Sequence, residues 1–138
     1  KIGTPDTVLN KEGQLTPEEF QLIKEHPERG AEIIQSIPFL RDRAPIVRFH
    51  HENFDGTGYP QGLRGEEIPL EARVLKIVDA YDALTSDRPY RRAKSPQEAL
   101  AILQKAKGSQ FDPDLIDLFE AWLQKEHFSQ SQLEMIEV

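Results

Sequence analysis

Apolar side chains recur at helical spacing along most of this chain, which predicts helices in both halves. The run Thr16-Pro17-Glu18-Glu19 is a capping box with proline at the first helical position, and it predicts a helix that reaches about residue 26. A second helix is expected from Pro27 to a stop at Pro38, with an apolar stripe of Ala31, Ile33, Ile34 and Ile37. A third helix is expected over about 42–51.

The second half continues this pattern after one long interruption. Residues 52–69 contain four glycines and two prolines and predict a loop. Loops of this length inside a domain are usually functional or disordered. Residues 70–85 read as a helix buried on most sides, and Ser95-Pro96-Gln97-Glu98 opens a helix to about Lys107 with Gly108 as its C-cap. Asp112-Pro113 begins the last clear helix, whose stripe is Leu115, Leu118, Phe119, Trp122 and Leu123.

These elements define an all-α fold, a bundle of about six helices with one long Gly/Pro-rich loop. We find no strand-like alternation, no repeat and no low-complexity tract. With 138 residues the chain is long enough for one domain with a core of its own. We place that domain at residues 1–126 and treat the polar residues 127–138 as a peripheral tail.

Composition narrows the classes of function. The net charge of -7 argues against nonspecific binding to long nucleic acid, although it allows a small phosphorylated ligand held by metals or by a local basic cluster. No apolar run approaches the roughly 20 residues that span a membrane, and we expect no membrane contact. The chain has no cysteine, which excludes a disulfide framework and a thiolate metal site and fits a cytoplasmic location.

Three histidines are the first candidates for metal chemistry. His50 and His51 are adjacent, and successive helical residues point about 100° apart. Both rings can therefore border one pocket or bind neighbouring metals; the alternative is one core and one surface histidine. His26 ends a helical pattern, where a histidine is also favourable without any function. His127 lies in the polar tail and is read as a surface residue.

Carboxylates on the expected helix 70–85 are the second group of candidates. Asp79 lies among apolar residues, and a buried carboxylate is costly unless it is paired or bound to metal. The alternatives are an ion pair with Arg73 or a solvent-facing position. Asp82 follows one turn later on the same side and is a candidate for orienting a ligand or a histidine. Nitrogen and oxygen ligands together are typical of hydrolytic metal sites.

Two further segments carry polar chemistry. Residues 87–94 form the dense basic cluster of an acidic chain, and the guanidinium groups of Arg88 and Arg91 suit phosphate oxygens. A solvated helix end is an equal interpretation of the cluster alone, but its position shortly after Asp79 favours phosphate. The Gly58-Tyr59-Pro60 loop is not a Walker-type phosphate loop. Its Tyr59 is a candidate for stacking on a base, with a rigid surface turn as the alternative.

Taken together, these runs resemble the HD-GYP subgroup of the HD metal-dependent phosphohydrolases. The resemblance extends over about residues 1–123 and rests on many fixed letters rather than on one motif. The matching runs are Glu25-His26-Pro27, His50-His51-Glu52 with Asp55-Gly56-Thr57-Gly58-Tyr59-Pro60, Gly65-Glu66-Glu67-Ile68-Pro69-Leu70, Asp79-Ala80-Tyr81-Asp82-Ala83-Leu84-Thr85-Ser86-Asp87-Arg88-Pro89-Tyr90-Arg91 and Gly108-Ser109-Gln110-Phe111-Asp112-Pro113.

The resemblance implies a bacterial signalling domain that hydrolyses cyclic di-GMP with two or three divalent metals, often iron or manganese. It further implies an upstream sensor or receiver domain, and a homodimer is possible. In the same way it assigns roles to single residues. The metal ligands would be His26, His50, His51 and Asp79, with the last three at the centre of catalysis. The groups that contact substrate would be Lys1, Tyr59, Asp82, Arg88 and Arg91.

One departure from the family pattern concerns the His-Asp pair for which the family is named. Lys1 resembles the lysine that ends the run containing this pair. We therefore expect an N-terminally truncated domain that lacks its first helices, with an incomplete metal site, little activity of its own and exposed apolar surface. Two alternatives to the phosphodiesterase remain open: a noncatalytic regulatory or interaction module, and an HD hydrolase of another nucleotide.

Overall fold

The computed structural model describes residues 2–11, 13–87 and 92–134, with side chains described as far as residue 125. The described residues are helical and contain no named strand, only an isolated bridge between Lys107 and Phe111. The predicted all-α class is thus confirmed. The α-helices are α1 Asp6–Leu9, α2 Pro17–Lys24, α3 His26–Ser36, α4 Ala44–Phe49, α5 Leu70–Thr85, α6 Pro96–Lys105 and α7 Pro113–Glu134, and the 3-10 segments are η1 Pro38–Arg43 and η2 Gly65–Glu67.

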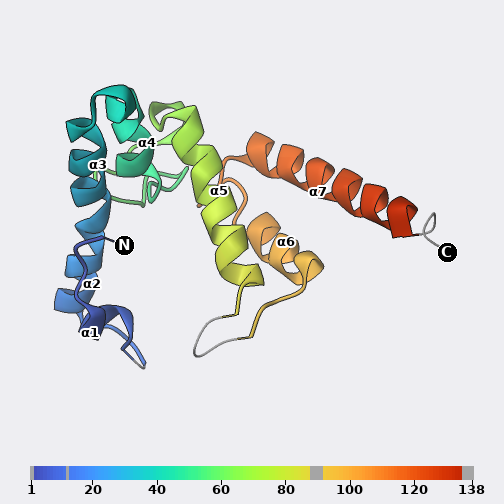
Figure 1. Cartoon of the computed structure of the whole chain (residues 1–138), viewed down its shortest axis with the longest axis horizontal. Coiled ribbons are helices and arrows are strands. Elements are labelled where there is room, and N and C mark those ends of the chain that lie inside the picture. The colour runs from blue at the N-terminus through green and yellow to red at the C-terminus, as the bar shows by residue number, and fades with distance from the viewer. Residues whose placement is uncertain (1, 12, 88–91, 135–138) are drawn as a thin grey trace.

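The helices form an open arrangement (Figure 1). Helices α1 to α3 follow one another along one side, α4 packs against α3, and α5 crosses the middle of the molecule. Helix α6 lies beside the C-terminal half of α5, and α7 projects away from the rest. The loop that joins α4 to α5 lies in the space between these two helices. This arrangement brings the end of α4 close to the start of α3.

Local signals placed most helix ends correctly. The Thr16 hydroxyl accepts the backbone N–H of Glu19 at 3.2 Å, and the Glu19 carboxylate accepts the backbone N–H of Thr16 at 2.7 Å. Ser95 and Glu98 form the same reciprocal pair at the start of α6. Capping boxes satisfy two of the N–H groups that a helix start leaves unpaired. Both boxes predicted from the sequence are therefore confirmed.

The third predicted helix is divided into η1 and α4, and proline explains the division. Pro45 is the second residue of α4 and has no N–H to donate to the preceding turn. A continuous α-helix from residue 42 would place its ring against the carbonyl of Arg41. The chain instead runs as a 3-10 segment to Arg43 and restarts at Ala44. The four-residue α1 was not predicted, because it is too short to show a helical period.

A buried apolar cluster lies where α5, α6 and α7 meet. It consists of Ile77, Leu103, Phe111 and Ile116, each at most 5% exposed. Burying an aliphatic side chain of this size contributes about 1.5–3 kcal/mol relative to exposure. Near its edge, Arg73 of α5 and Asp112 form an ion pair of 2.6 Å. This core fixes the direction of α5, which contributes one wall of the site described below.

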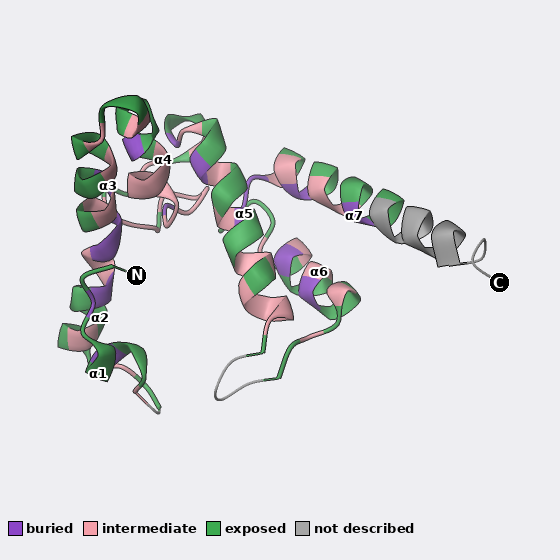
Figure 2. Cartoon of the chain, viewed as in Figure 1, coloured by how far each residue is buried: buried purple, intermediate pink, exposed green. Residues whose placement is uncertain are grey.

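The prediction that residues 70–85 are buried on most sides is wrong. Only Ala72 and Ile77 of α5 are buried, whereas Leu70, Val74, Leu75 and Val78 are between 37% and 53% exposed. Figure 2 shows the exposed residues along α5. The apolar pattern was read correctly, but burial requires a second element, and among the described residues none covers this side of α5. The exposed apolar surface expected from the sequence is present here.

Helix α7 also differs from the expectation. It continues to Glu134, so residues 127–134 extend the helix. Of its predicted stripe, Leu123 is buried, while Leu118 and Trp122 are 66% and 54% exposed. Gly108 takes a positive φ of 76°, but the C-cap of α6 is Ala106, two residues earlier. Within the described part of the chain, no helix is both long and apolar enough to span a membrane.

Candidate metal centre

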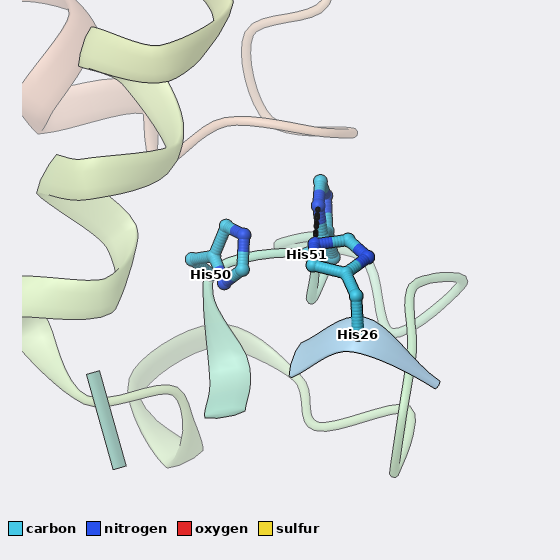
Figure 3. Close-up of side chains that lie close together, drawn as sticks. All are labelled: His26, His50 and His51. Atoms are coloured by element: carbon cyan, nitrogen blue, oxygen red, sulfur yellow. Dashed lines mark hydrogen bonds between the residues drawn. The ribbon is translucent and has the colours of Figure 1, made fainter. Parts of the chain in front are cut away.

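Three histidines from two segments meet at the junction of α3 and α4. His26 is the first residue of α3, His50 is the C-cap of α4, and His51 follows it. Their candidate ligand nitrogens all lie within 4.8 Å of one another. Figure 3 shows the three rings grouped together. His26 is buried and the other two are half-buried. The structure thus brings together the three histidines that the sequence singled out.

Backbone carbonyls fix the tautomers of two of these rings. Nδ1 of His26 donates to the Ile23 carbonyl, and Nδ1 of His50 donates to the Val47 carbonyl, each at 2.6 Å. A carbonyl oxygen can only accept, so Nδ1 carries the proton in both rings. Nε2 of each neutral ring is then left with its lone pair. Histidines that bind metal are commonly oriented by this kind of hydrogen bond.

The nitrogen spacing fits a shared metal ion. Nε2 of His26 and Nε2 of His51 are 3.2 Å apart. Two nitrogens bound to one metal at about 2.1 Å are separated by about 3.0 Å at a right angle and by about 3.4 Å at a tetrahedral angle. Nε2 of His51 donates this hydrogen bond, because the proton of the neutral His26 ring is on Nδ1. These residues therefore fit a divalent metal.

Asp79 approaches the histidines from α5. It lines a pocket of about 290 Å³ together with the three rings, and the remaining lining residues are Ile2, Gly30, Val47 and Leu75. Asp79 is exposed rather than embedded in the core as the sequence suggested, because this face of α5 is uncovered. Arg73 pairs with Asp112, so of the two alternatives considered for Asp79 the structure shows the solvent-facing position and not the ion pair with Arg73. No hydrogen bond or ion pair joins Asp79 to another described residue.

Burial and nearby carboxylates shift the pKa values of three groups in and around the pocket. Burial lowers the pKa of His50, while its bond to the Val47 carbonyl and the charge of Asp79 act in the opposite direction. Burial also lowers the pKa of Lys76, opposed by Glu52, Asp79 and Asp55. Burial, followed by the charge of Asp79, raises the pKa of Tyr59. The site therefore favours a neutral imidazole and a neutral phenol.

Glu52 organises the loop beside the histidines. Its side chain is 1% exposed. Its two carboxylate oxygens accept the backbone N–H groups of Gln61, Gly62 and Leu63 at 2.7, 3.1 and 3.1 Å. Sequence reasoning quoted Glu52 only as part of a motif and gave it no role. The sequence does show that Glu52 directly follows the candidate ligands His50 and His51 and directly precedes a loop whose backbone N–H groups need acceptors.

Gly58 allows this loop to pass close to the backbone behind it. A Cβ at this position would overlap the backbone nitrogen of Asn53 and lie 2.6 Å from both C and Cα of Glu52. Backbone atoms cannot move aside as a flexible side chain can, so only glycine fits here. The peptide bond between Tyr59 and Pro60 is cis. Close approach at Gly58 delivers Tyr59 to the metal centre.

Tyr59 lies flat against His51. The ring centroids are 5.0 Å apart and the planes differ by 21°. The backbone N–H of Tyr59 also donates to the His51 carbonyl at 3.4 Å. One face of Tyr59 is therefore occupied by a histidine, and a base cannot stack on that face. The loop therefore contacts the His51 ring through Tyr59.

The remaining candidate residues are more distant or fall outside the description. Asp82 is exposed on α5, accepts the Ser86 hydroxyl at 3.2 Å and does not line the histidine pocket. Asp87 accepts the backbone N–H of Ala93 at 2.7 Å. Lys1, Arg88 and Arg91 lie outside the described residues.

Comparison with known proteins shows the family to which the chain belongs. Residues 1–115 match a family described as HD domain. The chain is 46% identical over 119 residues to the cyclic di-GMP phosphodiesterase response regulator RpfG of Xanthomonas campestris pv. campestris, with 85% of this chain and 32% of that protein aligned. It is 44% identical over 128 residues to a cyclic di-GMP phosphodiesterase of Vibrio cholerae serotype O1, with 88% and 26% aligned.

A solved structure shows the same fold. The crystal structure of the Vibrio cholerae cyclic GMP-AMP phosphodiesterase V-cGAP3 superposes with a TM-score of 0.67 and 23% identity, over 89% of this chain and 32% of that one. At this identity the likeness concerns the fold alone. The chain spans about a third or less of the length of the curated relatives it matches.

Proposed function

This chain belongs to the HD domain family, and we propose that it is the metal-binding part of a phosphodiesterase that opens cyclic di-GMP to the linear dinucleotide. The observation that carries the proposal is the group of three histidines whose ligand atoms lie within 4.8 Å of one another. Two relatives more than 40% identical to this chain carry the name of that activity.

The proposed metal ligands are His26, His50, His51 and Asp79. Nitrogen and carboxylate ligands without thiolate suit iron or manganese at least as well as zinc, and we propose two or three such ions. Divalent metals, when bound, activate water and stabilise negative charge on phosphoryl oxygens. The protein's own contribution is the orientation of the ligands. The Ile23 and Val47 carbonyls hold the protons of His26 and His50 on Nδ1 and leave Nε2 for binding.

Residues around the ligands shape the pocket for an anionic substrate. Tyr59 covers one side of His51, and Glu52 holds the loop that carries Tyr59 in place. Lys76 adds positive charge close to Asp79, which favours a bound phosphate. We further propose that Lys1, Arg88 and Arg91 contact substrate phosphate and that Asp82 contacts a guanine, as their motif positions imply.

Replacement of Asp79 tests the ligand assignment. In the full-length protein, Asp79→Ala removes an exposed carboxylate that forms no hydrogen bond or ion pair with another described residue, so the fold should remain intact. We expect metal content and cyclic di-GMP hydrolysis to fall together, while far-UV circular dichroism stays that of the wild type. Asp117→Ala on α7 is a matched control, because Asp117 is an exposed aspartate far from the histidines that pairs with Lys107. Unchanged turnover in Asp79→Ala would remove this residue from the site.

A noncatalytic binding module is the second candidate. The observation that favours it is the position of Asp79, which shares the pocket but not the histidine cluster, so three nitrogens form the described cluster. Metal well below one ion per chain, together with saturable binding of cyclic di-GMP, would support this reading. A third candidate is an HD hydrolase of another nucleotide, and it is favoured by a relative in Vibrio cholerae, 34% identical over 125 residues, that carries the name 3'3'-cGAMP-specific phosphodiesterase 2. A panel of cyclic dinucleotides assayed side by side separates it from the first proposal.

A further inference from the structure

A cluster of rings continues outward from the histidines along α2. Tyr59 stacks on His51, and Phe20 meets Tyr59 edge to face with 6.4 Å between centroids and 79° between planes. Lys24, one turn after Phe20, places its ammonium 5.0 Å from the Phe20 centroid and 5.7 Å from the Tyr59 centroid. We refer to Phe20, Lys24 and Tyr59 as the aromatic edge.

Phe20 is not part of the core. Its side chain is 45% exposed, and the residue of α2 that is buried is Ile23. Single exposed apolar side chains are common on protein surfaces and need no function. Phe20 differs because it is joined through Tyr59 to a candidate metal ligand. The distance between the Phe20 and His51 rings cannot exceed the sum of the Phe20–Tyr59 and Tyr59–His51 centroid separations. One nucleotide is long enough to cover that distance.

Lys24 supplies a positive charge at the same place. No described carboxylate forms an ion pair with it, whereas the next residue, Glu25, pairs with Arg29 at 2.7 Å. The chain as a whole carries a net charge of -7, so a cation held over two rings is unlike its average surface. An exposed ring with an adjacent ammonium fits a ligand that is both aromatic and anionic.

We propose that the aromatic edge binds the nucleobase of the nucleotide substrate, with Phe20 stacking on the base and Lys24 donating to acceptors on its rim. The proposal rests on the proposed function, because it places the base beside the metal centre that would hold the phosphate. Stacking accepts any base. Guanine presents the acceptors O6 and N7, whereas adenine presents a donor beside N7, so Lys24 favours guanine.

Two ligands isolate the contribution of the base. GMP and ribose 5-phosphate share sugar and phosphate and differ only in the base. Their dissociation constants are measured by titration calorimetry on the full-length protein with Mn²⁺. The wild type should bind GMP more tightly than ribose 5-phosphate, and Phe20→Ala should reduce that preference about tenfold, the order expected for one lost base–aromatic stack. Phe20→Trp should retain it, since a larger ring still stacks.

Matched variants control for general effects. Ile33→Ala removes an apolar side chain of α3 with the same 45% exposure and should not change the preference for GMP. Lys24→Gln should lower the preference for GMP over AMP several-fold, whereas Lys105→Gln, an exposed lysine of α6, should not. The proposal is overturned if the wild type does not prefer GMP, if Phe20→Ala keeps that preference, or if Ile33→Ala loses it equally.

Hydrolysis measured in parallel separates this proposal from the proposed function. A wild type that prefers GMP through Phe20 but does not hydrolyse cyclic di-GMP supports the aromatic edge and contradicts the phosphodiesterase. A wild type that hydrolyses cyclic di-GMP, with GMP binding that does not depend on Phe20, supports the phosphodiesterase and contradicts the role proposed for the aromatic edge.

Discussion

The buried carboxylate of Glu52 provides a quantitative test of how the loop beside the metal centre is built. Glu52→Ala removes the acceptor of three consecutive backbone N–H groups, those of residues 61–63. An unsatisfied buried donor costs about 1–3 kcal/mol. Residues 61 and 62 are exposed and regain water when the carboxylate is removed, so the lower limit applies. We expect the free energy of unfolding to fall by about 3 kcal/mol, or about 10 °C in melting temperature.

Urea unfolding followed by far-UV circular dichroism measures this loss. Glu52→Gln keeps one carbonyl oxygen and should lose less than Glu52→Ala. Glu66→Ala is the matched control, because Glu66 is an exposed glutamate of the same loop, and its effect should stay within about 0.5 kcal/mol. A loss in Glu52→Ala no larger than that in Glu66→Ala would refute the role assigned to this carboxylate.

Three further predictions concern the loop, the core and the histidines. Gly58→Ala should displace the loop and lower metal affinity at least about tenfold, because its Cβ overlaps the backbone of Asn53; calorimetric Mn²⁺ titration checks this, and unchanged affinity contradicts it. Arg73→Met should cost about 3 kcal/mol in urea unfolding, because it leaves Asp112 buried without its cation; a loss below about 1 kcal/mol contradicts it. With metal removed by a chelator, the free energy of unfolding should fall as the pH drops below 6.5, the ordinary pKa of histidine. The pKa of His50 is lowered in the folded state, so below pH 6.5 the unfolded chain binds a proton that the folded chain does not. His50→Gln should weaken this pH dependence, and a pH profile identical to that of the wild type contradicts the prediction.

Helix ends were predictable because their signals are local. The capping boxes at Thr16 and Ser95 need only residues within one turn, and both form as expected. The grouping of the histidines followed from their positions at the ends of two adjacent helices and from the family resemblance. The division of the third helix is also encoded in the sequence by Pro45, but the helical spacing of Ile46, Val47 and His50 predicts one continuous helix.

Burial and loop architecture were less accessible. The apolar residues of α5 suggested burial, yet burial depends on which elements pack against a helix, and sequence patterns do not state that. Asp79 was placed in a core for this reason and is exposed. The partners of Glu52 could not be identified from its position next to the histidines, because they lie nine to eleven residues away. Phe20 and Tyr59 are separated by still more residues, and the sequence does not predict that their rings are in contact.

The central claim is that the three histidines hold the metal on which hydrolysis depends. Its most direct test measures metal content and cyclic di-GMP hydrolysis on the full-length protein purified without oxygen, in wild type, His51→Ala and His127→Ala. We expect about two metals per wild-type chain with turnover, a loss of both by at least about tenfold in His51→Ala, and wild-type values in His127→Ala. A wild type without metal or turnover, or a His51→Ala protein that matches it in both, would contradict the account.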